Sequence, residues 1–149
     1  MSLLAELLTP ESVLLNVEAS NKRRLFEIVA LAAEAQFNLS PMATVESLLA
    51  REKLGSTGLG QGIAIPHGRI RGLTRAIGFF VRPKEPIVFE APDRQPVRDV
   101  FVLLVPEAAT DEHLQILSEL AQKFSSKAFR EALAKADSGA SVYALFCAP

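Results

Sequence analysis

Apolar positions along the chain change their spacing several times, and each spacing predicts a different kind of element. Apolar runs over residues 13–17, 63–65, 76–82 and 97–105 predict strands. The stretch 100–105 is apolar at every position, which is typical of a strand buried on both faces. We therefore expect the strand over 97–105 to be covered from both sides.

Apolar residues that recur every three or four positions predict helices around these strands. Shorter helices are expected over 127–135 and 138–145. The expected helix-capping residues are Ser20, Ser40 with Pro41 at the first helical position, Gly55 and Thr110. The expected inward positions of the three longer helices are Leu25, Ile28, Val29, Ala32 and Ala33; Val45, Leu48 and Leu49; and Leu114, Leu117, Leu120, Ala121 and Phe124. Strands interleaved with helices predict an α/β fold: a single-domain sandwich with a mixed β-sheet and helices on both faces.

Composition fits one globular domain spanning residues 1–149, because 49% of the residues are hydrophobic and 22% are charged. Sixteen basic and seventeen acidic residues give a net charge of −1, which disfavours nucleic acid as a partner. Cys147 is the single cysteine and suits a reducing compartment. The N-terminal segment makes a poor signal peptide, and no apolar run approaches the roughly 18 residues that span a bilayer. A cytoplasmic protein without membrane insertion is expected.

A glycine-rich stretch over residues 55–68 carries one of the two histidines. His67 stands between a proline, which fixes the backbone, and a glycine, which leaves open space for a large partner group. Arg51 falls in the last turn of the preceding helix, and His113 falls in the first turn of a later one, where the helix dipole favours an anion. All three lie at the ends of elements, where α/β sheets bind ligands. Taken singly, each also has a plain reading, as a turn residue, a surface arginine or a capping histidine.

The usual phosphate, metal and hydrolase motifs are missing. Gln61 and Gly62 stand where a P-loop needs lysine and a hydroxyl residue, and the dinucleotide fingerprint lacks its third glycine. Two histidines far apart in the chain form no zinc pattern, and no nucleophile elbow occurs. We therefore expect no cofactor and no metal, and the chemistry that is left belongs to histidine itself.

The glycine-rich lead into Ile65-Pro66-His67-Gly68, with Arg51 sixteen positions upstream and His113 at a later helix start, resembles a known family. The chain is similar to enzyme IIA proteins of the bacterial phosphoenolpyruvate-dependent sugar phosphotransferase system, of the fructose and mannitol class. The resemblance extends over 13–146, and the blocks 51–58 and 62–68 look most like the nitrogen-regulatory branch.

This resemblance implies that His67 accepts a phosphoryl group, through Nε2, from a histidine-containing phosphocarrier protein. Arg51 and His113 match the supporting arginine and second histidine. The resemblance implies a regulatory role related to nitrogen and potassium, and the implied partners are regulated target proteins or an enzyme IIB. Two alternatives stay open: a sugar-specific enzyme IIA for fructose or mannitol, and an interaction module that is never phosphorylated. The further candidates for contact with the phosphoryl group are Ser56, Thr57, Gln61 and Gly68.

The chemistry agrees with this implication on independent grounds. A neutral imidazole has a free nitrogen lone pair near pH 7, so it can attack phosphorus without a separate base. Phosphoryl transfer spreads charge over the equatorial oxygens, so catalysis is mainly positioning and charge stabilisation. An arginine and the amides of a helix start can supply that stabilisation.

Overall fold

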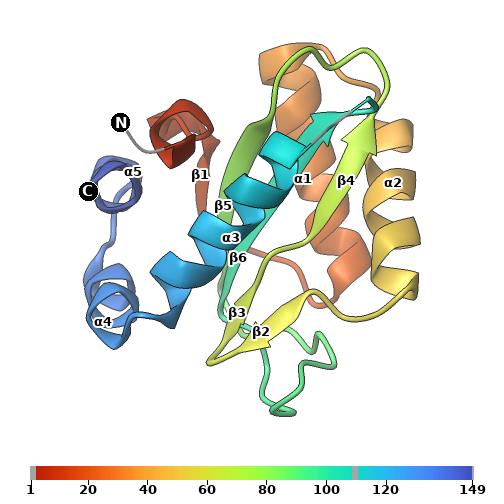
Figure 1. Cartoon of the computed structure of the whole chain (residues 1–149). Coiled ribbons are helices and arrows are strands. Elements are labelled where there is room, and N and C mark those ends of the chain that lie inside the picture. Colours follow the sequence, from red (N-terminus) through yellow and green to blue (C-terminus); the bar gives the residue numbers. More distant parts are fainter. Residues whose placement is uncertain (1–2, 109–110, 149) are drawn as a thin grey trace.

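The structure, a computed structural model, describes residues 3–108 and 111–148, and places one β-sheet between two layers of helices (Figure 1). Two short 3-10 turns come first, η1 (Leu3–Glu6) and η2 (Pro10–Ser12). The strands of the described ranges are β1 (Val13–Val17), β2 (Gly58–Gly60), β3 (Ile63–Ala64), β4 (His67–Ile70), β5 (Ile77–Pro83) and β6 (Asp99–Pro106). The α-helices in the same ranges are α1 (Lys22–Phe37), α2 (Pro41–Lys53), α3 (Asp111–Ser125), α4 (Lys127–Lys135) and α5 (Gly139–Cys147).

The sheet is mixed and is built around β6. Its strand order is β1-β5-β6-β3-β2, and β4 also pairs with β6. Strands β3 and β4 run parallel to β6, β1 runs parallel to β5, and the pairs β5–β6 and β2–β3 are antiparallel. The side chains of Val100 to Val105 are buried, as the continuous apolar run predicts.

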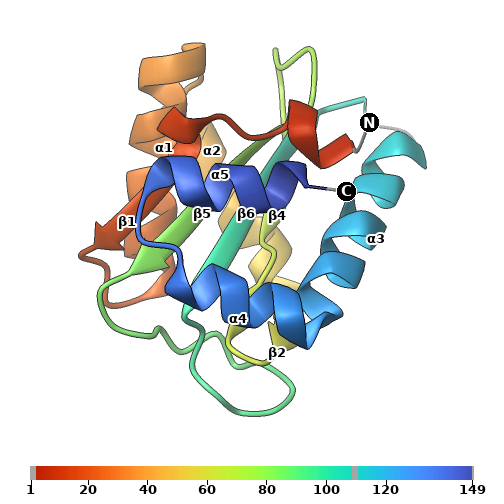
Figure 2. The same ribbon diagram turned by 90° about the vertical axis from the view of Figure 1, so that its left-hand side faces the viewer.

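Each face of the sheet packs against its own helices, so the predicted sandwich is confirmed. Helices α1 and α2 cover one face, where Phe26, Phe79 and Phe89 belong to one buried cluster. Helices α3, α4 and α5 cover the other face together with η1, as Figure 2 shows from that side, and Phe101 and Phe146 lie in the second cluster.

Several predicted helix ends are confirmed and others need correction. Ser40 caps α2 through its side chain, with Pro41 at the first position. Ser20 does not cap α1, because the chain turns one residue later and the Asn21 side chain accepts from Arg24 N at 2.8 Å. The C-cap of α2 is Leu54, with Gly55 following it. The expected cap Thr110 lies outside the described residues.

The predicted inward faces are confirmed in part. In α3 the side chains of Leu120 and Phe124 are buried, those of Leu117 and Ala121 are half-buried, and that of Leu114 is not among the described side chains. In α1 the side chains of Leu25, Val29 and Ala33 are buried, whereas Ile28 and Ala32 are half-buried at the rim of the face. In α2 only Leu48 of the expected set is fully buried. The expected strand over 97–105 begins later, at Asp99, because Val97 pairs with Ile87 in an isolated bridge instead. The strands expected over 63–65 and 76–82 shift by a residue at one or both ends, and α5 runs two residues beyond its expected end.

A buried ion pair ties the sheet to α4. The Asp99 carboxylate is fully buried at the start of β6 and accepts from Arg82 Nε at 2.8 Å. The other two guanidinium nitrogens of Arg82 donate to the carbonyl oxygens of Leu133 and Ala136, at 2.7 and 2.8 Å. Because Arg82 meets both the carboxylate and these carbonyls, the end of α4 is held against the sheet.

Candidate functional site

The glycine-rich stretch 55–68 contains more strand than the sequence predicts, because β2 and the start of β4 form on either side of the expected strand at Ile63–Ala64. Strand β4 begins at His67, which pairs with Leu103 of β6, while β2 forms a hairpin with β3. Strands β3 and β4 keep one shared register along β6, and the Pro66 carbonyl between them accepts from Leu103 N at 2.9 Å. Backbone pairing with a long buried strand therefore outweighs the weak strand propensity of the glycines.

Strand alternation decides which way the His67 side chain points. Ile63 and Ile65 belong to the cluster on the α3 side of the sheet, whereas Ala64 and Ile70 belong to the cluster on the α1–α2 side. Because alternate residues of a strand share a face, His67 points toward α3.

One nitrogen of the His67 ring is already occupied. Nδ1 lies 3.2 Å from the Ile65 carbonyl oxygen, and an oxygen of this kind can only accept, so Nδ1 carries the proton of the neutral ring. The lone pair of the neutral imidazole therefore lies on Nε2. Partial burial is the main cause that lowers the pKa of His67 below 6.5. The Ile65 hydrogen bond opposes it, and by smaller effects the Arg51 charge lowers this pKa and the Glu52 charge raises it. At neutral pH the ring is a free nucleophile.

His113 lies directly against this ring. The two ring centroids are 5.8 Å apart, and the planes meet edge to face at 66°. Among the described residues, His113 Nε2 is the one buried side-chain nitrogen or oxygen for which no hydrogen-bond partner is found. Burial, with smaller effects of His67 and Arg69, lowers the pKa of His113. Two neutral imidazoles thus face each other at the start of α3, with a polar atom available for a further group.

Positive charge reaches the histidine pair from two sides. Arg51 lies in the last turn of α2, as predicted, and its Nη1 donates to the Gly55 carbonyl oxygen at 2.9 Å. Arg69, which the sequence reasoning missed, lies two residues after His67 on the same face of β4, and its Nη1 donates to the Glu107 carbonyl oxygen at 3.2 Å. Alternation along a strand at 67–70 is the signal that would have found Arg69, had that strand been expected.

Gly68 allows β4 to lie close against α2. A Cβ built on Gly68 would overlap the Ser47 hydroxyl and come within 3.2 Å of the Ser47 Cβ. The same hydroxyl donates to the Arg69 carbonyl oxygen at 2.9 Å. The close approach and this hydrogen bond hold the strand of His67 beside the helix of Arg51.

The hydroxyls of Ser56 and Thr57 are engaged elsewhere. Ser56 Oγ donates to the Phe89 carbonyl oxygen, and Thr57 Oγ1 donates to the Glu52 carboxylate. A phosphoryl contact by either side chain would require one of these bonds to be exchanged, so that role stays a prediction.

Gln61 lies at the β2–β3 turn. Its backbone N donates to Asp93 Oδ2 at 2.9 Å. Its side chain is exposed beside a cavity of about 400 Å³ that also borders the far end of α3, at Phe124 and Ser125. Contact between Gln61 and a phosphoryl group likewise stays a prediction.

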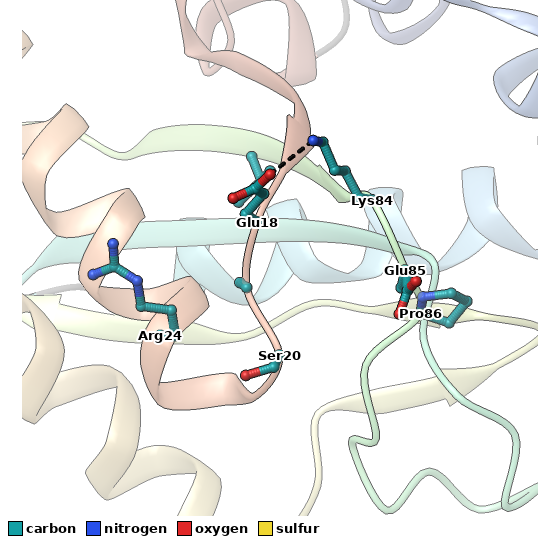
Figure 3. Close-up of a pocket in the computed structure, with 8 residues that line it drawn as sticks. Glu18, Ser20, Arg24, Lys84, Glu85 and Pro86 are labelled. Carbon is teal, nitrogen blue, oxygen red and sulfur yellow. Dashed lines mark hydrogen bonds and ion pairs between the residues drawn. The ribbon is translucent and has the colours of Figure 1, made fainter.

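A larger cavity, of about 630 Å³, lies elsewhere, where the end of β1 turns into α1 (Figure 3). Glu18 and Lys84 at its wall face each other in an ion pair of 2.8 Å, which neutralises both charges. Its lining includes neither histidine. Across residues 3–108 and 111–148, no three His, Cys, Asp or Glu side chains gather so as to hold a metal ion.

Proteins of known name are similar to this chain over nearly its whole length. A family model described as "Phosphoenolpyruvate-dependent sugar phosphotransferase system, EIIA 2" matches residues 6–148. A curated Escherichia coli K12 protein named nitrogen regulatory protein is 42% identical over 141 residues, covering 94% of this chain and 86% of the relative. A crystal structure of nitrogen regulatory protein IIA-Ntr from Neisseria meningitidis is 51% identical, with a TM-score of 0.91 over 97% of this chain and 99% of the other.

A more distant structure shares the fold. It is the Escherichia coli complex of the mannitol enzyme IIA with its phosphorylated enzyme IIB, which is 24% identical with a TM-score of 0.76, covering 93% of this chain and 96% of the other.

Proposed function

Because this chain belongs to the EIIA 2 family of the phosphoenolpyruvate-dependent sugar phosphotransferase system, we propose that His67 accepts and passes on a phosphoryl group. The observation that carries the proposal is the His67 ring itself, whose Nδ1 donates to the Ile65 carbonyl and whose Nε2 is left unprotonated beside His113. The donor is a histidine-containing phosphocarrier protein.

The transfer needs only groups that this site and the donor supply. The Nε2 lone pair of His67 attacks phosphorus as the N–P bond of the donor phosphohistidine breaks, and the electron pair of that bond returns to the donor imidazole. No proton has to leave His67, because the attacking nitrogen carries none.

The surrounding groups stabilise charge on the transferring phosphoryl oxygens. The guanidinium of Arg51 is available on the α2 side, and the unpartnered Nε2 of His113, when it carries the proton of the neutral ring, can donate to an oxygen from the α3 side. A charge-assisted hydrogen bond of this kind is worth roughly 1.5 to 3 kcal/mol. Such modest stabilisation suits a carrier, because an over-stabilised phosphohistidine would not release its group.

The role of this carrier is regulatory, and it concerns nitrogen. The Escherichia coli relative and the Neisseria meningitidis structure both carry the name nitrogen regulatory protein, and they match nearly the whole of this chain. We propose regulated target proteins as the partners that respond to the phosphorylation state of His67. The family match over 6–148 supports treating residues 1–149 as one enzyme IIA domain.

The sugar-specific alternative makes a different prediction about the acceptor. An enzyme IIA of that type transfers its phosphoryl group to an enzyme IIB, as a fructose or mannitol system requires. Incubating the phosphorylated protein with fructose and mannitol enzyme IIB domains separates the two, because the regulatory form is expected to retain its label.

No helix in the described part of the chain is long and apolar enough to cross a membrane.

The proposal is tested by phosphorylation followed by intact-protein mass measurement. Incubation with phosphoenolpyruvate and the general phosphotransferase proteins is expected to add one acid-labile phosphoryl group to the protein. His67→Ala should take up none, and Arg51→Ala should take it up more slowly, by roughly tenfold to hundredfold. His113→Ala should accept the group yet transfer it poorly in single-turnover kinetics. If His67→Ala is labelled as much as the wild-type protein, His67 is not the phosphorylation site and the proposal is refuted.

A further inference from the structure

A buried carboxylate lies next to Arg51 and takes no direct part in the proposed transfer. Glu52 is in the last turn of α2, and its side chain is only 5% exposed. One oxygen, Oε2, accepts from Lys22 Nζ at 2.8 Å, so the first residue of α1 neutralises the charge. The other oxygen, Oε1, accepts both from the backbone N of Thr57 at 3.1 Å and from the Thr57 hydroxyl.

Thr57 connects this carboxylate to the strand that leads into His67. The Thr57 carbonyl oxygen accepts from Ile65 N at 3.1 Å. The carbonyl oxygen of Ile65 in turn accepts from Nδ1 of His67 at 3.2 Å. A series of hydrogen bonds, joined by the backbone of Thr57 and of Ile65, therefore links Glu52 to the imidazole ring.

These bonds act on the ring through position. The Glu52 carboxylate holds Thr57 by two hydrogen bonds, and Thr57 in turn holds Ile65, although the N–H and C=O of one residue belong to different peptide groups and so do not polarise one another directly. The Ile65 carbonyl is thereby held where it can accept from Nδ1. As long as this bond persists, the ring proton stays on Nδ1 and Nε2 stays free to attack.

We propose that Glu52 is a positioning residue, which acts through Thr57 and Ile65 to hold His67 in the tautomer that exposes Nε2. This inference rests on the proposed function of His67 as phosphoryl acceptor. It also gives Thr57 a task other than contact with the phosphoryl group.

The test compares substitutions that remove single links of the path. Glu52→Gln keeps the shape and removes the charge, Thr57→Val removes only the hydroxyl donor, and Thr57→Ser restores that donor. Glu46→Gln is the matched control, because Glu46 is an exposed glutamate on the same helix. Two quantities are measured for each folded variant: the ¹⁵N chemical shifts of the His67 ring without phosphate, and the single-turnover rate of phosphoryl uptake from the phosphorylated phosphocarrier protein.

We expect Glu52→Gln to slow uptake by roughly tenfold to hundredfold and Thr57→Val by roughly threefold to tenfold, from the strengths of charged and neutral hydrogen bonds. In both variants the neutral ring should populate both of its tautomers. Thr57→Ser and Glu46→Gln should have the same tautomer and the same uptake rate as the wild-type protein. If Glu52→Gln does not fold, the His67 tautomer in Thr57→Val tests the proposal instead. The inference is overturned if the ring remains wholly in the Nδ1–H form in these variants, whether or not uptake slows.

The two proposals fail in different ways. If the wild-type protein takes up no phosphoryl group, the proposed function of His67 is refuted, yet the ¹⁵N shifts of its ring still show whether Glu52 controls the tautomer. If the wild-type protein is phosphorylated on His67 and the His67 tautomer is unchanged in Glu52→Gln, only the positioning role of Glu52 is refuted.

Discussion

Replacing Gly68 with alanine adds one methyl group at the contact between β4 and α2. That methyl group would overlap the Ser47 hydroxyl and also meet the Ser47 Cβ at 3.2 Å and its backbone carbonyl carbon at 3.3 Å. The backbone of a helix cannot move aside as the tip of a flexible side chain can. We therefore expect β4 to move away from α2 and His67 to move with it.

The expected cost follows from what the methyl group meets. Overpacking a closely packed contact costs about 1 to 3 kcal/mol in the free energy of unfolding. Ser47→Gly removes the obstructing side chain, at the cost of the Ser47–Arg69 hydrogen bond, about 0.5 to 1.5 kcal/mol, and of a helix-propensity loss of about 0.5 kcal/mol. In the Ser47→Gly background only the 3.3 Å contact with the backbone carbonyl carbon remains, so the alanine at position 68 should cost less, and the two substitutions should couple by about 0.5 to 2 kcal/mol.

The measurement is a double-mutant cycle by urea unfolding, accompanied by the phosphoryl uptake rate of each variant. Ala50→Gly, an exposed substitution in α2, measures a helix-propensity loss without a lost contact and should cost about 1 kcal/mol, roughly twice the loss expected when serine is replaced by glycine. Gly68→Ala should also slow uptake, because an error of about 1 Å in the position of a reacting group can cost a hundredfold in rate. If the costs of Gly68→Ala and Ser47→Gly simply add, the close approach is not what Gly68 provides, and the reasoning is refuted.

Two further predictions concern charge. Because the pKa of His67 is lowered below 6.5 in the folded protein, the pH at which uptake falls to half should lie below 6.5. Arg51→Gln removes a charge that lowers this pKa, so it should move that midpoint to higher pH, and an unchanged midpoint would contradict the assigned effect. Arg82→Leu leaves the fully buried Asp99 with Arg98, whose Nη2 lies 3.3 Å from the carboxylate, and should cost about 1 to 3 kcal/mol in urea unfolding, against less than about 1 kcal/mol for the exposed Arg24→Leu. A cost for Arg82→Leu as small as the control would show that the buried pair does not hold α4.

The elements with local signals could be predicted from the sequence. The strand at the sheet centre follows from six consecutive apolar residues, and α2 follows from a serine cap with a proline behind it. The first residue of α1 could not be predicted, because serine and asparagine are equally good N-caps and both occur here, at Ser20 and Asn21. Which of them caps the helix depends on the path of the chain after the end of β1.

The candidate site was harder, because its arrangement depends on contacts that have no local signal. The histidines and Arg51 could be proposed from their places at element ends. Strand β4 could not, because its hydrogen bonds come from β6, more than thirty residues later in the chain. Glu52 and Arg69 were missed for the same reason, since the first needs the fold to bring Lys22 to it and the second needs the strand to set its direction.

The shared register of β3 and β4 along β6 makes the spacing between Ile63 and His67 a matter of odd and even numbers. Inserting or deleting a single residue there would turn the imidazole through the sheet to face α2, out of reach of His113, whereas a change of two would restore its side. Evolution can therefore vary this segment by composition but not by single steps of length, and an engineered loop graft must respect the same parity.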